Sequence, residues 1–114
     1  MIITTTPFVA GHRVTHNMGQ VLGLVVRSRG LAGNLTASIR SLIGGEITEY
    51  TELLEDTRRQ AMDRMVQNAT LLGANAVISM RFDSSELNNS MSEIVAYGTA
   101  VVVQPDSGAA QPTE

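Results

Sequence analysis

The chain of 114 residues contains no cysteine, no tryptophan and no lysine. Without cysteine it can form no disulfide, no thiolate nucleophile and no thiolate metal site. Without lysine it cannot form a Schiff base or supply the lysine of a Walker-type phosphate loop. These absences remove several common classes of enzyme and the usual soft-metal sites before any pattern is considered.

Basic charge and aromatic side chains are also scarce. The net charge is −3, and the eight basic residues are all arginine, scattered from Arg13 to Arg81. The chain has two tyrosines and two phenylalanines, which is too few for base-stacking platforms. Because nucleic-acid binding usually needs a clustered basic face, we expect no nucleic-acid partner.

Long apolar runs and targeting signals are missing from the sequence. Residues 1–7 lack the basic region and the apolar core of a signal peptide. The longest apolar run, near residues 21–26, is far shorter than the ~20 residues that span a membrane. We expect a cytoplasmic protein with no membrane partner. Its charged fraction of 17% is below the usual ~25% and mildly favours self-association.

The first half of the chain predicts two strands and a helix. Residues 2–6 are β-branched and end at a proline, which is typical of a short edge strand. Residues 13–27 predict one long strand, or two strands bent at Gly19 or Gly23, where a bulge or a close backbone approach is expected. From Leu31 to Leu42 apolar residues recur every three or four positions, which predicts a short amphipathic helix.

The second half predicts a long helix and two strands. Residues 48–72 carry one apolar stripe with acidic residues early and arginines later, as the helix dipole favours. Residues 75–83 alternate and place Ile78, Met80 and Phe82 on one face. The polar residues 83–92 predict a loop, and residues 93–104 predict a valine-rich strand paired with the preceding one.

These elements define an α+β domain in the order β-β-α-α-β-β. The expected architecture is an antiparallel sheet with two helices on one face. It occupies residues 1–104, and residues 105–114 have the composition of a disordered tail. The chain is too short to cover the second face of the sheet. We therefore expect another copy of the chain to cover it, as a homo-oligomer.

Five short segments, in this order, resemble the YbjQ-like family of small bacterial proteins labelled as heavy-metal-binding. They are TTTP at residues 4–7, GQVLG at 19–23, SIRSLIGG at 38–45 followed by Tyr50, LGANAV at 72–77, and YGTAV at 97–101. The resemblance covers about residues 2–103. It implies a dodecin-like α+β subunit, a pentameric ring of subunits and, through the family label, a metal ion as cofactor.

The candidate metal ligands are His12 and His16, the two imidazoles of the chain. Four residues of strand separate their backbones by about 13 Å, too far for one ion. A turn between them, or ligands from neighbouring subunits around a ring axis, would restore a site. The alternative is a pair of partly exposed histidines near the start of a strand.

A second candidate is an anion site where the two helices meet. Gly44 and Gly45 precede the N-terminus of the long helix, whose backbone amides favour a phosphate or carboxylate. Arg40 and Tyr50 flank this segment. The simpler interpretation is a tight turn between helices, in which Arg40 pairs with a neighbouring group and Tyr50 packs.

No pattern in the sequence indicates catalysis. There is no Gly-x-Ser-x-Gly elbow, and neither histidine belongs to a recognisable triad. Two functions remain open. The first is an oligomeric protein that binds a small ligand or an ion, with the site at subunit interfaces. The second is a structural protein whose function is assembly itself.

Overall fold

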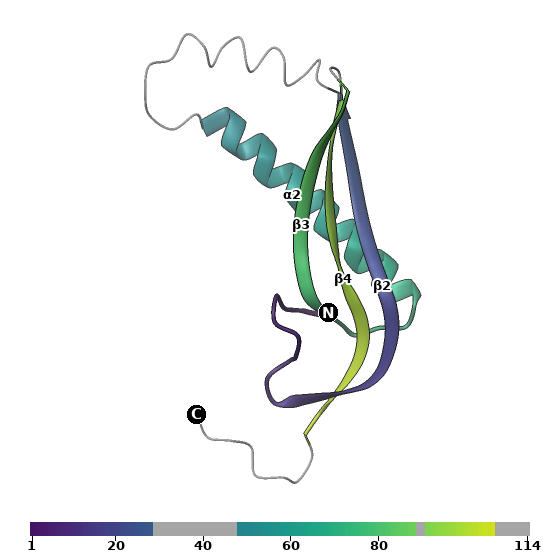
Figure 1. Ribbon diagram of the computed structural model, residues 1–114. Helices are drawn as coiled ribbons and strands as arrows, with labels where there is room; N and C mark the ends of the chain where they lie inside the picture. The colour runs from purple at the N-terminus through teal and green to yellow at the C-terminus, as the bar shows by residue number, and fades with distance from the viewer. Residues whose placement is uncertain (29–47, 89–90, 107–114) are drawn as a thin grey trace.

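The structure is a computed structural model that describes residues 1–28, 48–88 and 91–106. Four strands and one helix lie in these residues, and Figure 1 shows the helix lying obliquely across the sheet. The elements are β1 (Ile2–Ile3), β2 (His12–Ser28), α2 (Thr48–Leu71), β3 (Ala76–Asn88) and β4 (Met91–Pro105). The predicted α+β class, the long second strand and the long helix are confirmed. The first predicted helix, residues 31–42, lies outside the described residues, so one helix is described where two were expected.

The sheet is mixed, and the prediction of an all-antiparallel sheet was wrong at β1. The strand order is β1-β3-β4-β2, with β4 antiparallel to both of its neighbours. However, β1 pairs in parallel with β3, through Ile2 opposite Ala76 and Ile3 opposite Val77. After β1 the chain crosses to the opposite edge of the sheet, where it forms β2. After α2 the chain lies next to β1 again and forms β3. This crossover makes the two strands parallel.

The hairpin of β3 and β4 is longer than predicted. Residues 83–92 were expected to form a polar loop, but Ser84 pairs with Ile94 and Ser85 with Glu93. The Ser85 hydroxyl also donates to the Glu93 carboxylate at 3.0 Å. Polar residues continue the ladder here because they lie where the sheet is exposed to solvent, and an exposed strand needs no apolar face.

A β-bulge at Ser79 interrupts the predicted alternation of β3: Met80 and Phe82 share a face as predicted, but Ile78 does not. Ser79 has φ of 53°, and the register shifts between Ile78 and Arg81. Because a bulge inserts one residue, it reverses which side chains face each side of the sheet. Ile78 therefore packs with Val9 on one face, whereas Met80 lies in the core on the other.

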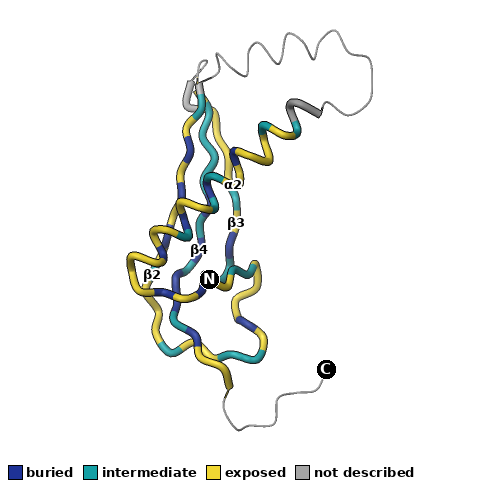
Figure 2. Tube along the Cα trace, turned by 180° about the vertical axis from the view of Figure 1, so that it is seen from behind, coloured by how far each residue is buried: buried dark blue, intermediate teal, exposed yellow. Residues whose placement is uncertain are grey.

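The helix packs on the sheet through buried residues spaced four apart. Ala61, Met65 and Ala69 are fully buried, and Figure 2 shows the buried side of α2 turned toward the strands. Gly23 of β2 lies directly beneath them, where a Cβ atom would overlap the backbone of Ala61 and Met65. The close approach expected at a glycine of this strand is therefore confirmed at Gly23. The β-bulge expected at a glycine of the same strand occurs at Gly19, which has φ of 94° and lies beside a register shift.

Side chains of α2 also cover part of the edge of the sheet. β2 is an edge strand, and an edge exposes unpaired backbone groups that can recruit other chains. The Arg64 guanidinium donates to the Leu24 carbonyl at 2.6 Å, and the Asn68 amide donates to the Leu22 carbonyl at 2.7 Å. The helix thereby occupies two carbonyls in the middle of this edge.

The face of the sheet opposite α2 carries exposed apolar side chains on β2. Leu22, Leu24 and Val26 alternate with the buried residues beneath the helix and are 46%, 44% and 47% exposed. No described residue covers them. A sheet face of this kind is the feature that led us to expect a second copy of the chain, although the oligomeric state itself stays a prediction.

Candidate functional site

A pocket opens between the first half of α2, the last residues of β2 and the first residues of β4. Its volume is ≈ 70 Å³, enough for a few water molecules or a ligand of a few heavy atoms. Apolar side chains form most of the wall, with one guanidinium and two hydroxyls among them. The lining residues are Val25, Arg27, Leu53, Leu54, Thr57, Ser92 and Ile94.

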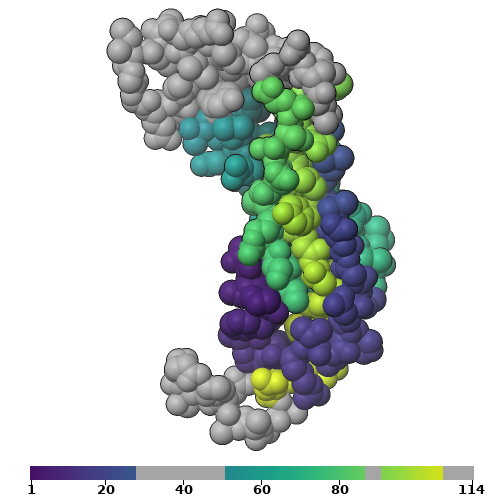
Figure 3. Space-filling model, viewed as in Figure 1, coloured from purple at the N-terminus to yellow at the C-terminus, as the bar shows by residue number. Residues whose placement is uncertain are grey.

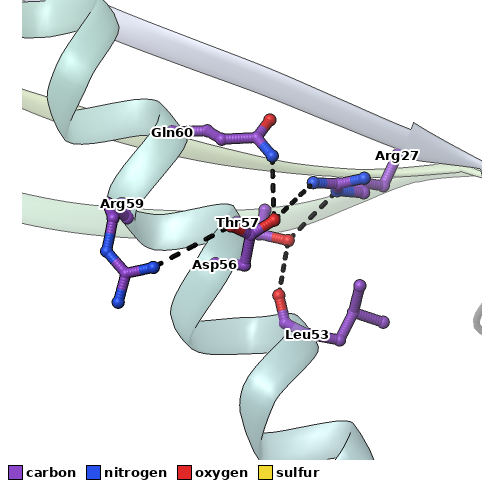
Figure 4. Close-up of polar contacts among 6 residues, drawn as sticks. All are labelled: Arg27, Leu53, Asp56, Thr57, Arg59 and Gln60. Carbon is purple, nitrogen blue, oxygen red and sulfur yellow. Dashed lines mark hydrogen bonds and ion pairs between the residues drawn. The ribbon is translucent and has the colours of Figure 1, made fainter.

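Thr57 fixes the position of the pocket's guanidinium. Its side chain is 3% exposed, and its hydroxyl donates to the Leu53 carbonyl at 2.8 Å. The same hydroxyl accepts a hydrogen bond from Arg27 Nε at 3.0 Å (Figure 4). Since both hydrogen-bonding directions of the hydroxyl are used, it anchors Arg27 to the helix.

The rest of the Arg27 guanidinium is incompletely paired. Its Nη2 lies 3.6 Å from an Asp56 carboxylate oxygen, which is beyond hydrogen-bond distance. This nitrogen is buried and has no hydrogen-bond partner among the described residues. Asp56 also lies 3.9 Å from Arg59 and accepts a hydrogen bond from the Gln60 amide at 2.9 Å. One exposed carboxylate is thus shared by two guanidinium groups.

Sequence reasoning missed this pocket, although two signals pointed to it. Arg27 lies on the same face of β2 as Val21 and Val25, whose side chains are buried beneath the helix. Thr57 stands on the apolar stripe of α2, one turn before Ala61. A charged residue and a hydroxyl residue, each on a buried face of its own element, predict a polar pair between the two elements.

The predicted metal ligands His12 and His16 lie on β2, in the part of the strand remote from the pocket. The ring Nδ1 of His12 lies 2.9 Å from the Ala10 carbonyl, and that of His16 lies 3.1 Å from the Thr15 hydroxyl. Within the described ranges no cluster of three or more histidine, cysteine or acidic residues could hold a metal ion. The interfacial metal site at His12 and His16 stays a prediction.

The residues of the predicted anion site fall largely outside the described part of the chain. Arg40, Gly44 and Gly45 lie in residues 29–47, which the structure does not describe. Tyr50 belongs to the first turn of α2, and its side chain is likewise not described. This site stays a prediction.

The geometry defines a class of protein: a small α+β domain with one described helix on a four-stranded mixed sheet, and a small pocket between them. None of the described helical residues forms a segment long and apolar enough to cross a membrane. The chain belongs to the YbjQ family, whose model, described as "Putative heavy-metal-binding", matches residues 1–104. The resemblance found from the short segments is confirmed.

Relatives in bacteria and archaea match over nearly the whole chain. A UPF0145 protein from Bradyrhizobium sp. (strain ORS 278) is 59% identical over 105 residues, which cover 92% of this chain and 95% of the relative. A UPF0145 protein from Methanoregula boonei is 54% identical over 112 residues, covering 98% and 93%. A third, from Sulfurisphaera tokodaii, is 58% identical over 103 residues, covering 90% of each chain.

A crystal structure of a protein of unknown function from Pediococcus pentosaceus, which belongs to the DUF74 family, shares the fold. The TM-score is 0.59 over 91% of this chain and 98% of that protein, with 17% sequence identity. At this identity the similarity shows the fold alone.

Proposed function

We propose that the protein is a homo-oligomer that binds a small carboxylate in the pocket of Arg27. The observation that carries this proposal is the buried Nη2 of Arg27, a charged donor without a hydrogen-bond partner among the described residues. A buried donor left unpaired costs roughly 1–3 kcal/mol. Because this nitrogen is buried, a carboxylate oxygen would become its acceptor only when the Arg27 side chain turns toward the pocket that it lines.

The local charge supports an anionic ligand. Arg27 and Arg59 share the single carboxylate of Asp56, so these three side chains carry a net positive charge. Asp56 is 52% exposed and lies farther than a hydrogen bond from Arg27. A ligand carboxylate can therefore pair with Arg27 while Asp56 remains with Arg59 and Gln60.

The walls of the pocket support a short apolar tail on the ligand. Val25, Leu53, Leu54 and Ile94 surround the guanidinium, and pockets of this composition favour ligands that are mostly apolar with one oriented polar group. The volume of ≈ 70 Å³ restricts the tail to a few carbon atoms. A short-chain carboxylate fits both conditions.

Self-association is the second part of the proposal. The exposed Leu22, Leu24 and Val26 support it, because a monomer would leave this row of aliphatic side chains in water. The family resemblance implies a ring, with five as its subunit number. A purely structural protein would share this assembly but would bind nothing in the pocket.

Ligand-induced stabilisation separates these two functions. We expect n-butyrate to raise the melting temperature of the wild-type protein, compared with sodium chloride at equal ionic strength. Arg27→Met should abolish this increase. Arg59→Met, which removes the same charge from the side of Asp56 outside the pocket, should retain it. An equal response of the two variants, or no response of the wild type, would rule out the pocket as the binding site.

Metal binding is the second candidate, favoured by the description of the family model. In this case His12 and His16 of neighbouring copies would contribute ligands together around a symmetry axis. Equilibrium dialysis against zinc and copper, followed by elemental analysis, tests this directly. Uptake in stoichiometric amounts that disappears in a double variant, His12→Ala with His16→Ala, would support it, and the absence of uptake would exclude it.

A further inference from the structure

A hollow lies at the C-terminal end of α2, beside the β2 edge of the sheet. Its volume is ≈ 440 Å³. Leu71 at its rim is 85% exposed, the largest fraction for any large apolar side chain in the described ranges, and Leu72 is 45% exposed. The lining residues are Gln20, Val21, Leu22, Asn68, Leu71 and Leu72.

The opposite edge of the sheet presents a projecting aromatic side chain. Phe8 follows β1 and is 58% exposed. Its backbone is nevertheless fixed, because its carbonyl accepts hydrogen bonds from the Thr4 hydroxyl at 3.5 Å and the Thr6 hydroxyl at 2.5 Å. The next residue, Val9, is buried in the core. An aromatic ring on so ordered a segment can dock with little loss of conformational entropy.

The hollow and the phenylalanine cannot meet within one copy of the chain. The strand order β1-β3-β4-β2 places the segment after β1 at one edge and β2 at the other. Figure 3 shows the N-terminal segment at one side of the molecule, with the end of α2 emerging behind β2 at the other. A projection and a hollow on opposite edges are the arrangement that a head-to-tail contact between identical copies requires.

The two surfaces also match in chemistry. Residues 2–10 contain no charged side chain, and neither do the six residues that line the hollow. Contact between them would therefore desolvate no charge, whereas the amides of Gln20 and Asn68 supply a polar rim. A phenylalanine ring, which buries roughly 150–250 Å², is an effective anchor for such an interface.

We propose that Phe8 of one copy inserts into the hollow beside Leu71 and Leu72 of the next copy. This inference rests on the proposed self-association and specifies its contact. The interface uses different surfaces on its two sides, so repetition of the contact closes into a ring when the rotation between copies allows.

Because the natural chain has no cysteine, engineered cysteines can test this contact without a background. We would prepare two single variants, Phe8→Cys and Leu71→Cys, refold them together as a mixture and then oxidise the mixture. The expected result is a disulfide-linked dimer in the mixture and none in either variant alone. A matched control pairs Phe8→Cys with Val14→Cys, whose native side chain is 44% exposed on β2 outside the hollow; this pair should remain unlinked.

Two results would overturn the contact. One is a mixture that links no better than the Val14 control, and the other is efficient linkage of Phe8→Cys with itself, which would indicate a two-fold interface. As a second measurement, Phe8→Ala should weaken assembly by roughly 10- to 100-fold, as expected for an anchor residue, whereas Val14→Ala should not. Native mass spectrometry of the same variants distinguishes the failures, since an oligomer without linkage refutes this contact alone and a monomer refutes self-association as well.

Discussion

Replacing Gly23 with alanine would place a methyl group where the backbone of α2 lies. The added Cβ would overlap the Ala61 carbonyl oxygen and the Met65 amide nitrogen, and it would lie 3.0 Å from Met65 Cα. These are backbone atoms of a regular helix, so no side-chain rotation can relieve the overlap. The helix must move away from β2, and the core between them must loosen.

The expected cost follows from two opposing terms. Overpacking a well-packed core costs typically 1–3 kcal/mol and occasionally more, and the upper end applies here because the helix has to move as a unit. Replacing glycine in a strand recovers roughly 0.5–1 kcal/mol of backbone entropy. We therefore expect Gly23→Ala to lower the free energy of unfolding by about 2–2.5 kcal/mol.

Urea denaturation monitored by circular dichroism, at one fixed protein concentration, measures this loss. The matched control is Gly19→Asn, because Gly19 has φ of 94° with no atom within 4 Å of an added Cβ, and asparagine tolerates positive φ. We expect this control to remain within about 1 kcal/mol of the wild type. If Gly23→Ala proves as stable as the wild type or the control, the helix does not rest on Gly23.

Three further substitutions test the packing and the polar contacts. Met65→Ala removes a fully buried side chain and should cost about 2–5 kcal/mol in urea denaturation; a loss below 1 kcal/mol would mean that this position is not core. Thr57→Val leaves Arg27 Nε without its acceptor and should cost about 1–3 kcal/mol, whereas Thr57→Ser should recover most of the loss in thermal melts. Asn75→Ala removes two hydrogen bonds to the Val103 backbone, at 2.9 and 2.8 Å. It should cost about 1–3 kcal/mol and speed amide exchange at Val103, and unchanged exchange there would contradict this role.

The sequence was sufficient to predict a helix or strand, and its buried face, where a regular apolar pattern agrees with the packing. The apolar stripe predicted for residues 48–72 is buried at Thr57, Ala61, Met65 and Ala69, whereas Leu54 and Leu72 of the same stripe are 39% and 45% exposed. One continuous strand was one of the two arrangements predicted for residues 13–27, which are rich in valine and leucine, and β2 is such a strand.

Other features depended on backbone geometry that side-chain patterns do not encode. The bulge at Ser79 reverses the faces of β3, and nothing about a serine in an alternating segment distinguishes it from a regular strand residue. The parallel pairing of β1 depends on the path of the whole chain rather than on its own residues. The polar hairpin was missed because exposed strands need no apolar alternation.

The candidate site was missed for a related reason. Scanning for histidines and glycine-rich turns selected residues by their chemical type, and so it led to His12, His16 and the double glycine. Arg27 and Thr57 stand out only when the face of the strand or helix is considered together with the residue type. Each is a polar residue on a face whose other side chains are buried.

Native mass spectrometry of the full chain in the presence of n-butyrate tests the central claim most directly, because it reports assembly and ligand together. The proposal predicts one homo-oligomeric species that carries butyrate in the wild type and in Arg59→Met but not in Arg27→Met. A monomer at micromolar concentration, or equal butyrate binding in all three proteins, would contradict it.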